Sequence, residues 1–179
     1  LARKFALWRN RPDVFVREVF GAEPDAWQDE VLRAFPKEKR IAMPASKGPG
    51  KSTVLAWLAW NFLFTRPHPK IAATSVTAKN LEDGLWAEMA KWQQKSELLT
   101  TFFEWQKTRI ICRDHPETWW MSARSWARGA DPQQQADTMA GLHADYVLFL
   151  LDESGGIPMA VMAAAEAALS TGIEAHIVQ

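Results

Sequence analysis

The sequence predicts an α/β fold in which helices flank a mostly parallel central sheet. Short apolar runs alternate with longer helical stretches, the order expected of parallel strands joined by crossover helices. The run 146–151 is apolar without interruption, which is typical of a strand covered on both faces. The stretch 54–64 is too apolar for a surface helix and fits a helix packed against a sheet.

The first half of the chain is expected to contain two short helices before the first strand. They are predicted at 13–20 and 26–35, the second capped by residues 23–25. Strands at 41–43 and 70–75 lie on either side of the apolar helix, which should end before two prolines. Thr77 or Asn80 should cap the next helix, whose apolar stripe has helical spacing.

The second half is expected to supply the remaining strands. Segment 102–105 fits either helix or strand, and 108–112 and 118–122 should be strands joined by a turn. Residues 128–136 are polar and predict a loop. A helix at 159–169 and a last strand at 175–179 complete the order.

Composition restricts the class of protein. At 179 residues the chain has the size of one domain with a substantial core. Its formal net charge is zero, so no overall basic field points to nucleic acid or to a membrane surface. Its one cysteine, Cys112, excludes an internal disulfide, and no apolar run approaches the ~20 residues that a membrane span needs.

Segment 40–53 has the order that a nucleotide-phosphate site requires: strand, glycine-containing loop, then a lysine and a hydroxyl opening a helix. Loop N–H groups surround an anion, the helix N-terminus adds positive potential, and the lysine neutralises the outer phosphates. The pattern G-x-x-x-x-G-K-[ST] is complete except that alanine replaces the first glycine. A Gly-Lys-Ser triplet alone also fits a surface turn, but the apolar helix after it favours the phosphate site. The residues predicted to bind nucleotide here are Ala45, Ser46, Lys47, Gly48, Pro49, Gly50, Lys51, Ser52 and Thr53.

Two acids follow the apolar strand at 146–151. Open α/β sheets bind ligands at the carboxyl ends of their strands, so these acids are expected to face the phosphate loop. Asp152 is predicted to hold Mg²⁺ together with Ser52, and Glu153 to activate the water that attacks ATP. An exposed acidic turn is the simpler alternative, which the upstream loop makes less attractive.

These residues resemble the large terminase subunit of tailed bacteriophages over roughly 26–179. The resemblance lies in the loop 46–52, the pair Trp27-Gln28, and Asp152-Glu153 after the lead-in 141–146. It implies a P-loop ATPase of the additional-strand, conserved-glutamate type that packages double-stranded viral DNA into a procapsid. The implied partners are the viral DNA, the portal protein, the small terminase subunit and further copies in a ring. The implied location is the portal vertex in the host cytoplasm, away from membranes.

The resemblance also implies roles for single residues. Gln28 matches the glutamine on the adenine side, so 1–38 would be an adenine-side helical segment and 39–179 the P-loop core. Lys47 matches an extra basic residue of the loop, which would act in catalysis with Lys51 and Glu153.

The chain departs from the family in two places. Ala140 stands where many relatives have a catalytic arginine, and Arg124 or Arg128 are the alternatives for that role. The core is expected to be truncated at its C-terminal end and the nuclease domain to be absent, so no DNA cleavage is expected of this chain.

Two other functions fit the same residues. A P-loop helicase or recombination-type DNA-dependent ATPase would share the site and a similar sheet. In a non-hydrolysing nucleotide-binding assembly module, the alanine at position 45 would reflect loss of the hydrolytic motif. Against that loss, Lys51, Ser52, Asp152 and Glu153 supply the groups that hydrolysis needs from one subunit.

Overall fold

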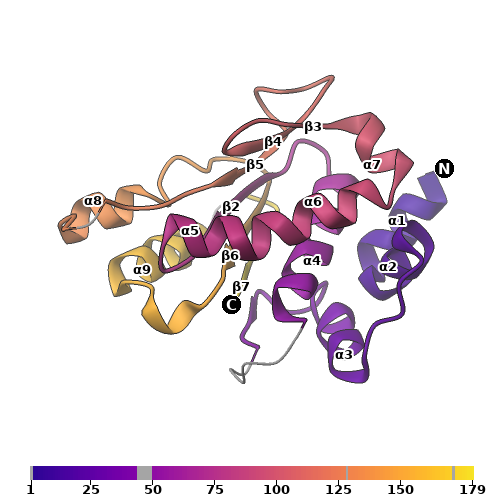
Figure 1. The fold of residues 1–179 in the computed structure, drawn as a ribbon, viewed down its shortest axis with the longest axis horizontal. Coiled ribbons are helices and arrows are strands. Elements are labelled where there is room, and N and C mark those ends of the chain that lie inside the picture. Colours follow the sequence, from indigo (N-terminus) through magenta and orange to yellow (C-terminus); the bar gives the residue numbers. More distant parts are fainter. Residues whose placement is uncertain (1, 44–49, 128, 171) are drawn as a thin grey trace.

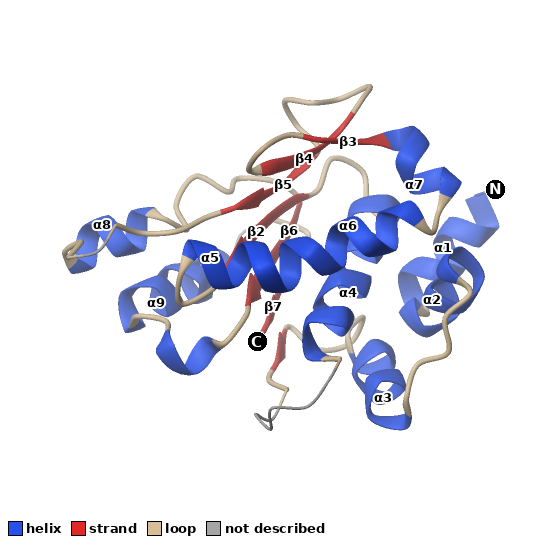
Figure 2. Ribbon diagram, viewed as in Figure 1, coloured by secondary structure: helices blue, strands red, loops and turns tan. Residues whose placement is uncertain are grey.

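The computed structural model describes residues 2–43, 50–127, 129–170 and 172–179 (Figure 1). Among these residues, a seven-stranded sheet has the strand order β1-β7-β6-β2-β5-β4-β3 (Figure 2). The first five strands in this order, β1, β7, β6, β2 and β5, are parallel to one another. The last two, β4 and β3, extend the sheet in antiparallel fashion. The mostly parallel sheet expected from the sequence is therefore confirmed. The strands are β1 (Arg40–Ile41), β2 (Lys70–Thr74), β3 (Phe103–Trp105), β4 (Arg109–Cys112), β5 (Trp120–Ala123), β6 (Tyr146–Leu151) and β7 (Glu174–Val178).

Strand β7 lies between the two strands that lead to the predicted site. It pairs with β1 on one side and with β6 on the other. The strand before the phosphate loop and the strand before the two acids are therefore separated by one additional strand. This arrangement agrees with the additional-strand type of P-loop fold expected from the sequence.

Helices cover both faces of the sheet. One apolar core joins α4 to alternate strand residues such as Ile71, Leu148 and Leu150, and a second core joins α9 to Ala72 and Phe149. The alternation along β2 and β6 follows from the period of two in a strand. The helices are α1 (Ala2–Asn10), α2 (Pro12–Phe20), α3 (Ala26–Ala34), α4 (Lys51–Thr65), α5 (Ala78–Leu81), α6 (Ala87–Gln94), α7 (Glu97–Phe102), α8 (Pro132–Asp137) and α9 (Met159–Ala168), with a π-helical turn η1 (Glu82–Trp86) and a 3-10 turn η2 (Ser154–Gly156).

Helix α4 is the centre of the first core. Every residue from Val54 to Thr65 is buried, as the unbroken apolar run predicts. Its one amide, Asn61, donates to the carbonyl of Trp8 (2.8 Å) and accepts from the Arg66 guanidinium (2.9 Å), so no hydrogen bond is lost by its burial. The helix ends before Pro67, where the sequence predicts the break.

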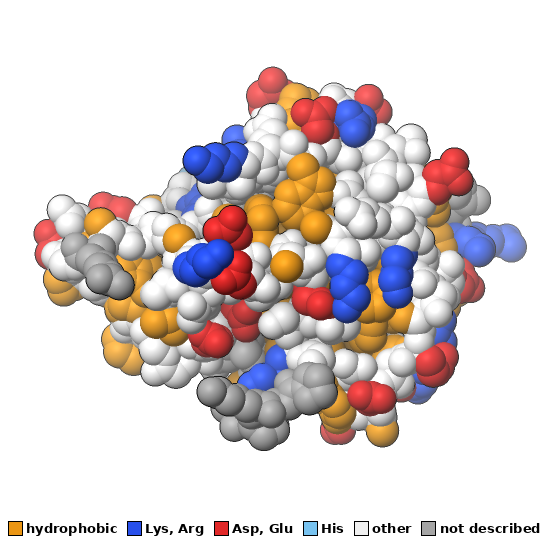
Figure 3. Space-filling model, in the orientation of Figure 1, with side chains coloured by type: hydrophobic (Ala, Val, Ile, Leu, Met, Phe, Trp, Pro, Cys, Tyr) orange, Lys and Arg blue, Asp and Glu red, His pale blue; other side chains and the backbone are white. Residues whose placement is uncertain are grey.

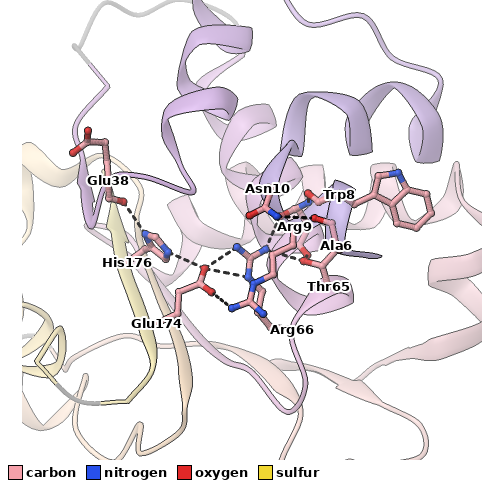
Figure 4. A network of polar contacts seen from close by, with 10 residues as sticks. Ala6, Trp8, Arg9, Asn10, Glu38, Thr65, Arg66, Glu174 and His176 are labelled. Atoms are coloured by element: carbon pink, nitrogen blue, oxygen red, sulfur yellow. Dashed lines mark hydrogen bonds and ion pairs between the residues drawn. The ribbon is translucent and has the colours of Figure 1, made fainter. Parts of the chain in front are cut away.

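A buried ionic network ties the amino end of β7 to the helices (Figure 4). The Glu174 carboxylate accepts from Arg66 (2.7 Å) and Arg9 (2.7 Å) and contacts His176 Nε2 (3.0 Å). Burial alone would raise the pKa of Glu174, but the hydrogen bonds from His176 and Arg66 outweigh it and hold that pKa far below its usual range. The carboxylate is therefore ionised in the fold and links β7 to the ends of α4 and α1.

Several local predictions differ from the structure. The predicted loop 128–136 is wrong, because α8 begins within it: Asp131 and Gln134 form a capping box and Pro132 opens the helix. The predicted strand 41–43 is confined to β1, although the Met43 N–H still donates to the Gln179 carbonyl (2.7 Å). The ambiguous 102–105 falls at the junction of α7 and β3. In the described part of the chain, no helix combines the length and the apolarity needed to cross a membrane.

Candidate functional site

A cavity of about 1080 Å³ opens at the carboxyl end of β6. Three described segments supply most of its lining: the first turn of α4, the end of β6 with the residues after it, and one side of the continuous helix formed by α5, η1 and α6. Met43 and Gln179 line it as well. Lys51, Ser52, Asp152 and Glu153 all belong to this lining. Four residues that the sequence assigns to one site are therefore brought into one cavity.

The first turn of α4 begins at Gly50. Its φ of 112° lies in the range that favours glycine, and a Cβ there would meet Gln28 Nε2 at 2.5 Å. Lys51, Ser52 and Thr53 follow as half-buried residues at the positive end of a 15-residue helix. The other predicted loop residues, Ala45, Ser46, Lys47, Gly48 and Pro49, lie outside the described residues.

Asp152 connects the end of β6 to the first turn of α4. Its N–H donates to the Thr74 carbonyl (2.9 Å), and its carboxylate lies beside the Ser52 hydroxyl and in the field of Lys51. Burial and the neighbouring Glu153 raise the pKa of Asp152 above its ordinary value, while Ser52 and Lys51 act in the opposite direction. The positive charge near the Asp152 carboxylate thus does not offset its burial and the neighbouring acid.

The donor set fits a magnesium ion. A hydroxyl and a carboxylate in contact are hard oxygen ligands, and the raised pKa of Asp152 marks a place where a cation is favourable. Within the described ranges, no group of three or more His, Cys, Asp or Glu residues could hold a metal alone. Mg²⁺ commonly takes only one or two protein ligands beside phosphates and waters, so Ser52 and Asp152 suffice for it.

Glu153 stands at the exposed rim of the cavity in a strained conformation. Its backbone is left-handed (φ 55°, ψ 46°), which is uncommon for a residue with a side chain and is found most often at functional positions. Its Oε2 accepts a hydrogen bond from Asn80 Nδ2 at 2.6 Å. The turn after β6 therefore aims this carboxylate at helix α5.

Gln28 lies against the start of α4. Its Oε1 accepts from the Asp25 N–H (2.9 Å) as part of the α3 capping box, and its Nε2 lies 3.4 Å from the Gly50 carbonyl. The side chain is 5% exposed. Both ends of the amide are thus engaged by protein groups at the edge of the nucleotide segment.

Sequence reasoning predicted the helix after Thr77 but missed that it lines the cavity. Asn80 was considered only as a cap, and Thr77 in fact caps α5. Glu88 received no role, yet its Oε2 accepts from Thr53 Oγ1 (2.9 Å) and from Trp92 Nε1 (2.9 Å), and Oε1 pairs with Lys91 (3.0 Å). Burial opposes ionisation of Glu88, but these hydrogen bonds lower its pKa. No signal in the sequence showed which side of this helix faces the cavity.

Arg124 lies away from the cavity. Its Nη1 donates to the carbonyls of Thr138 (2.9 Å) and Ala140 (2.8 Å), and its Nε to Ser122 Oγ (3.1 Å). Burial, and secondarily Arg109, lower the pKa of Arg124. Its guanidinium thus reaches the backbone of Ala140. Arg128 lies outside the described residues.

The surface charges are mixed. On the face drawn in Figure 3, Lys and Arg side chains stand beside Asp and Glu side chains rather than in a single-sign patch. Near the cavity, Lys79 pairs with Asp83 (2.8 Å) and Lys91 with Glu88. The described residues on this face therefore form no single-sign basic patch.

Solved large terminases of bacteriophages have the same fold. The large terminase ATPase domain of Thermus phage P74-26 matches with a TM-score of 0.68 and 22% identity over 94% of this chain and 69% of that one. The HK97 bacteriophage large terminase matches with a TM-score of 0.69 and 14% identity over 95% of this chain and 37% of that one. The large terminase of a thermophilic bacteriophage in complex with ADP matches with a TM-score of 0.59 and 13% identity over 86% of this chain and 35% of that one.

The similarity is structural. No protein-family model matches the chain, and no curated protein matches it in sequence. The chain has the fold of the ATPase domain of phage large terminases and spans just over a third of the HK97 terminase chain. The P-loop α/β fold expected from the sequence is confirmed.

Proposed function

We propose that this chain is the ATPase domain of a phage DNA-packaging motor, and that it binds and hydrolyses Mg·ATP in the cavity at the end of β6. One observation carries the proposal: the Ser52 hydroxyl at the start of α4 and the Asp152 carboxylate after β6 line one cavity, and they lie 4.0 Å and 3.2 Å from the same Cβ position at Gly84. These two groups come from the two motifs that ATP hydrolysis needs, and the fold is that of terminase ATPase domains.

The first turn of α4 is proposed to bind the phosphates. Free N–H groups at a helix N-terminus favour an anion, and Lys51 adds a full positive charge on the same turn. Lys47 would add a second positive charge from the loop. Gln28, which contacts Gly50, is proposed to border the adenine from the N-terminal segment 1–38.

The magnesium ion is proposed to be held by Ser52 and Asp152. When bound, it would neutralise phosphate charge and orient the terminal phosphates. The pKa of Asp152 is raised by burial and by Glu153, so a divalent cation would compensate a carboxylate that lacks positive charge. Lys51 would share the neutralisation from the opposite side.

Glu153 is proposed to orient and deprotonate the attacking water. Its strained backbone points the carboxylate along the cavity rim, and the 2.6 Å hydrogen bond from Asn80 fixes its direction. A base must reach the water rather than the metal, which distinguishes Glu153 from Asp152. An arginine from this chain or from a neighbouring copy would complete charge stabilisation.

The role of the whole assembly follows from the structural likeness and is a proposal in the same sense. A ring of copies at the portal vertex in the host cytoplasm would move double-stranded viral DNA into a procapsid. The portal protein and the small terminase subunit would be its partners. A nuclease activity is not proposed for this chain.

Nucleotide binding is the first test. A fluorescent ATP analogue should bind the wild-type chain in Mg²⁺, and Lys51→Ala should weaken binding by at least tenfold. Lys107→Ala is the matched control, since Lys107 is an exposed lysine in the β3–β4 turn. Equal affinities for all three proteins, or no binding by the wild type, would contradict the proposal.

Turnover is the second test, made with a portal-assembled motor. Glu153→Ala should bind nucleotide with wild-type affinity but release no phosphate, because only the water-activating group is lost. Undiminished hydrolysis would refute the role of Glu153. Stimulation by single-stranded DNA together with strand separation would instead favour a helicase.

A further inference from the structure

The helix that closes the cavity contains a π-helical turn at its centre. Residues 78–94 form one continuous helix in which α5 passes into η1 and then into α6 (Figure 1). Turns of this kind are rare, and they occur frequently at functional sites. The cavity-facing side of the helix carries Asn80, Gly84 and Glu88 at successive spacings of four. Gly84 is the middle residue of η1.

Gly84 lies close to the two proposed magnesium ligands, and most closely to Asp152. A Cβ at this position would lie 3.2 Å from Asp152 Oδ2 and 4.0 Å from Ser52 Oγ. The first distance is shorter than ordinary van der Waals contact, so a methyl group would displace the carboxylate by a few tenths of an ångström.

The backbone at Gly84 does not itself require glycine. Gly84 is not among the described glycines with positive φ, so an L-residue can adopt its conformation. Glycine also disfavours helix formation more than every residue except proline. Local structure would therefore be served better by alanine, and the space beside Asp152 is the constraint that the structure shows at this position.

The helix cannot easily retreat to make room. On one side of Gly84, Asn80 Nδ2 donates to Glu153 Oε2 (2.6 Å), and on the other, Glu88 Oε2 accepts from Thr53 Oγ1 (2.9 Å). The residue after Gly84, Leu85, is fully buried. A side chain at position 84 would therefore act on Asp152 rather than on the position of the helix.

We propose that Gly84 is a specificity-determining residue of the site, whose missing side chain keeps open the space beside Asp152 Oδ2 and Ser52 Oγ that a divalent cation with its terminal phosphate occupies. The inference rests on the proposed function. It adds a requirement for glycine that neither motif contains, and it places that requirement on the helix formed by α5, η1 and α6.

The variant Gly84→Ala tests this directly. Its melting temperature without nucleotide should equal or exceed that of the wild type, because alanine is the better helix former. Its affinity for a fluorescent ATP analogue in Mg²⁺ should fall at least tenfold, while its affinity in EDTA should stay within twofold of wild type. Glu82→Ala is the control, since Glu82 is an exposed residue of the same turn that does not line the cavity. It should bind as the wild type does.

The outcomes separate the two proposals. If the wild type binds Mg·ATP and Gly84→Ala binds it equally well, the inference is overturned and the proposed function stands. If the wild type shows no magnesium-dependent nucleotide binding, the proposed function fails and the inference with it. A loss in Gly84→Ala that is equal in Mg²⁺ and in EDTA also overturns the inference, since the defect would then not involve the cation.

A measurement on the unmodified protein applies even if the variant does not fold. Mn²⁺ in place of Mg²⁺, added with ADP, broadens the NMR signals of nearby nuclei. The amide signal of Gly84 should disappear at one equivalent of Mn·ADP, while that of Gly21, at the end of α2, should persist. A sharp Gly84 signal at saturating Mn·ADP would overturn the inference.

Discussion

Replacing Glu174 by glutamine should strongly destabilise the protein. Glu174 is the only carboxylate that Figure 4 places among Arg66, Arg9 and His176, and the Arg66 side chain is 1% exposed. Breaking a buried ion pair by removing one partner costs about 3–5 kcal/mol, because the remaining charge stays buried. Glu174 itself is 17% exposed, so we expect the lower end of this range, about 3 kcal/mol. For a chain of this size that lowers the melting temperature by about 6–12 °C.

The assay compares Glu174→Gln with the loss of an exposed Arg–Glu pair of similar length. Arg113 Nη1 and Glu104 Oε2 are 2.8 Å apart, but both side chains are about half exposed. Such pairs contribute at most about 1 kcal/mol, so Glu104→Gln should have little effect in thermal and urea unfolding. Equal destabilisation by the two variants would refute the importance of burial.

The pH dependence provides an independent check. The pKa of Glu174 is lowered in the folded protein, so the unfolded chain binds more protons in the acid range and stability rises with pH there. The contribution of Glu174 is complete above its unfolded pKa of about 4.3 and is lost as the pH falls below it. The stability difference between wild type and Glu174→Gln should therefore shrink in acid. A difference independent of pH would contradict the assignment.

Three further predictions concern the cavity. Thr53→Val removes the donor to Glu88 and should cost about 1–3 kcal/mol in urea unfolding, whereas Thr53→Ser, which keeps the hydroxyl, should cost less. Asn80→Ala releases the Glu153 carboxylate and should lower kcat by about tenfold or more with unchanged KM in steady-state phosphate release; a parallel rise in KM would contradict it. Asp152→Asn should raise the melting temperature without nucleotide near neutral pH, because the raised pKa of Asp152 means that the fold disfavours the ionised carboxylate. The same variant should remove the effect of Mg²⁺ on nucleotide affinity. A lower melting temperature would refute the reasoning.

Much of the fold was predictable because its main elements have strong local signals. The helix α4 and the strand β6 are apolar throughout, and both are buried as expected. The α8 helix was missed because it has no buried residues, so no apolar stripe marks it. Its capping box and first-turn proline were the only local signals.

The site was predictable to the extent that its residues follow a motif. Lys51, Ser52, Asp152 and Glu153 were identified by type and spacing, and the sheet topology brings them to one cavity. The contributions of Gly84 and Glu88 were not predictable, because they depend on which side of a helix faces the cavity. A π-helical turn changes which side chains of the helix point toward the cavity, and nothing in the sequence indicated this turn.

Strand β7 lies between the strands that lead to the two halves of the cavity, and it is paired to different extents on its two sides. Strand β7 forms five register pairs with β6 but only two with β1, at Arg40 and Ile41. The β1 seam is the shorter of the two by register, and further backbone hydrogen bonds join residues 39–43 to Ile177 and Gln179. Asp152 and Glu153 therefore follow a strand that is paired along its length on both sides, whereas Met43 follows a strand that is paired over two residues.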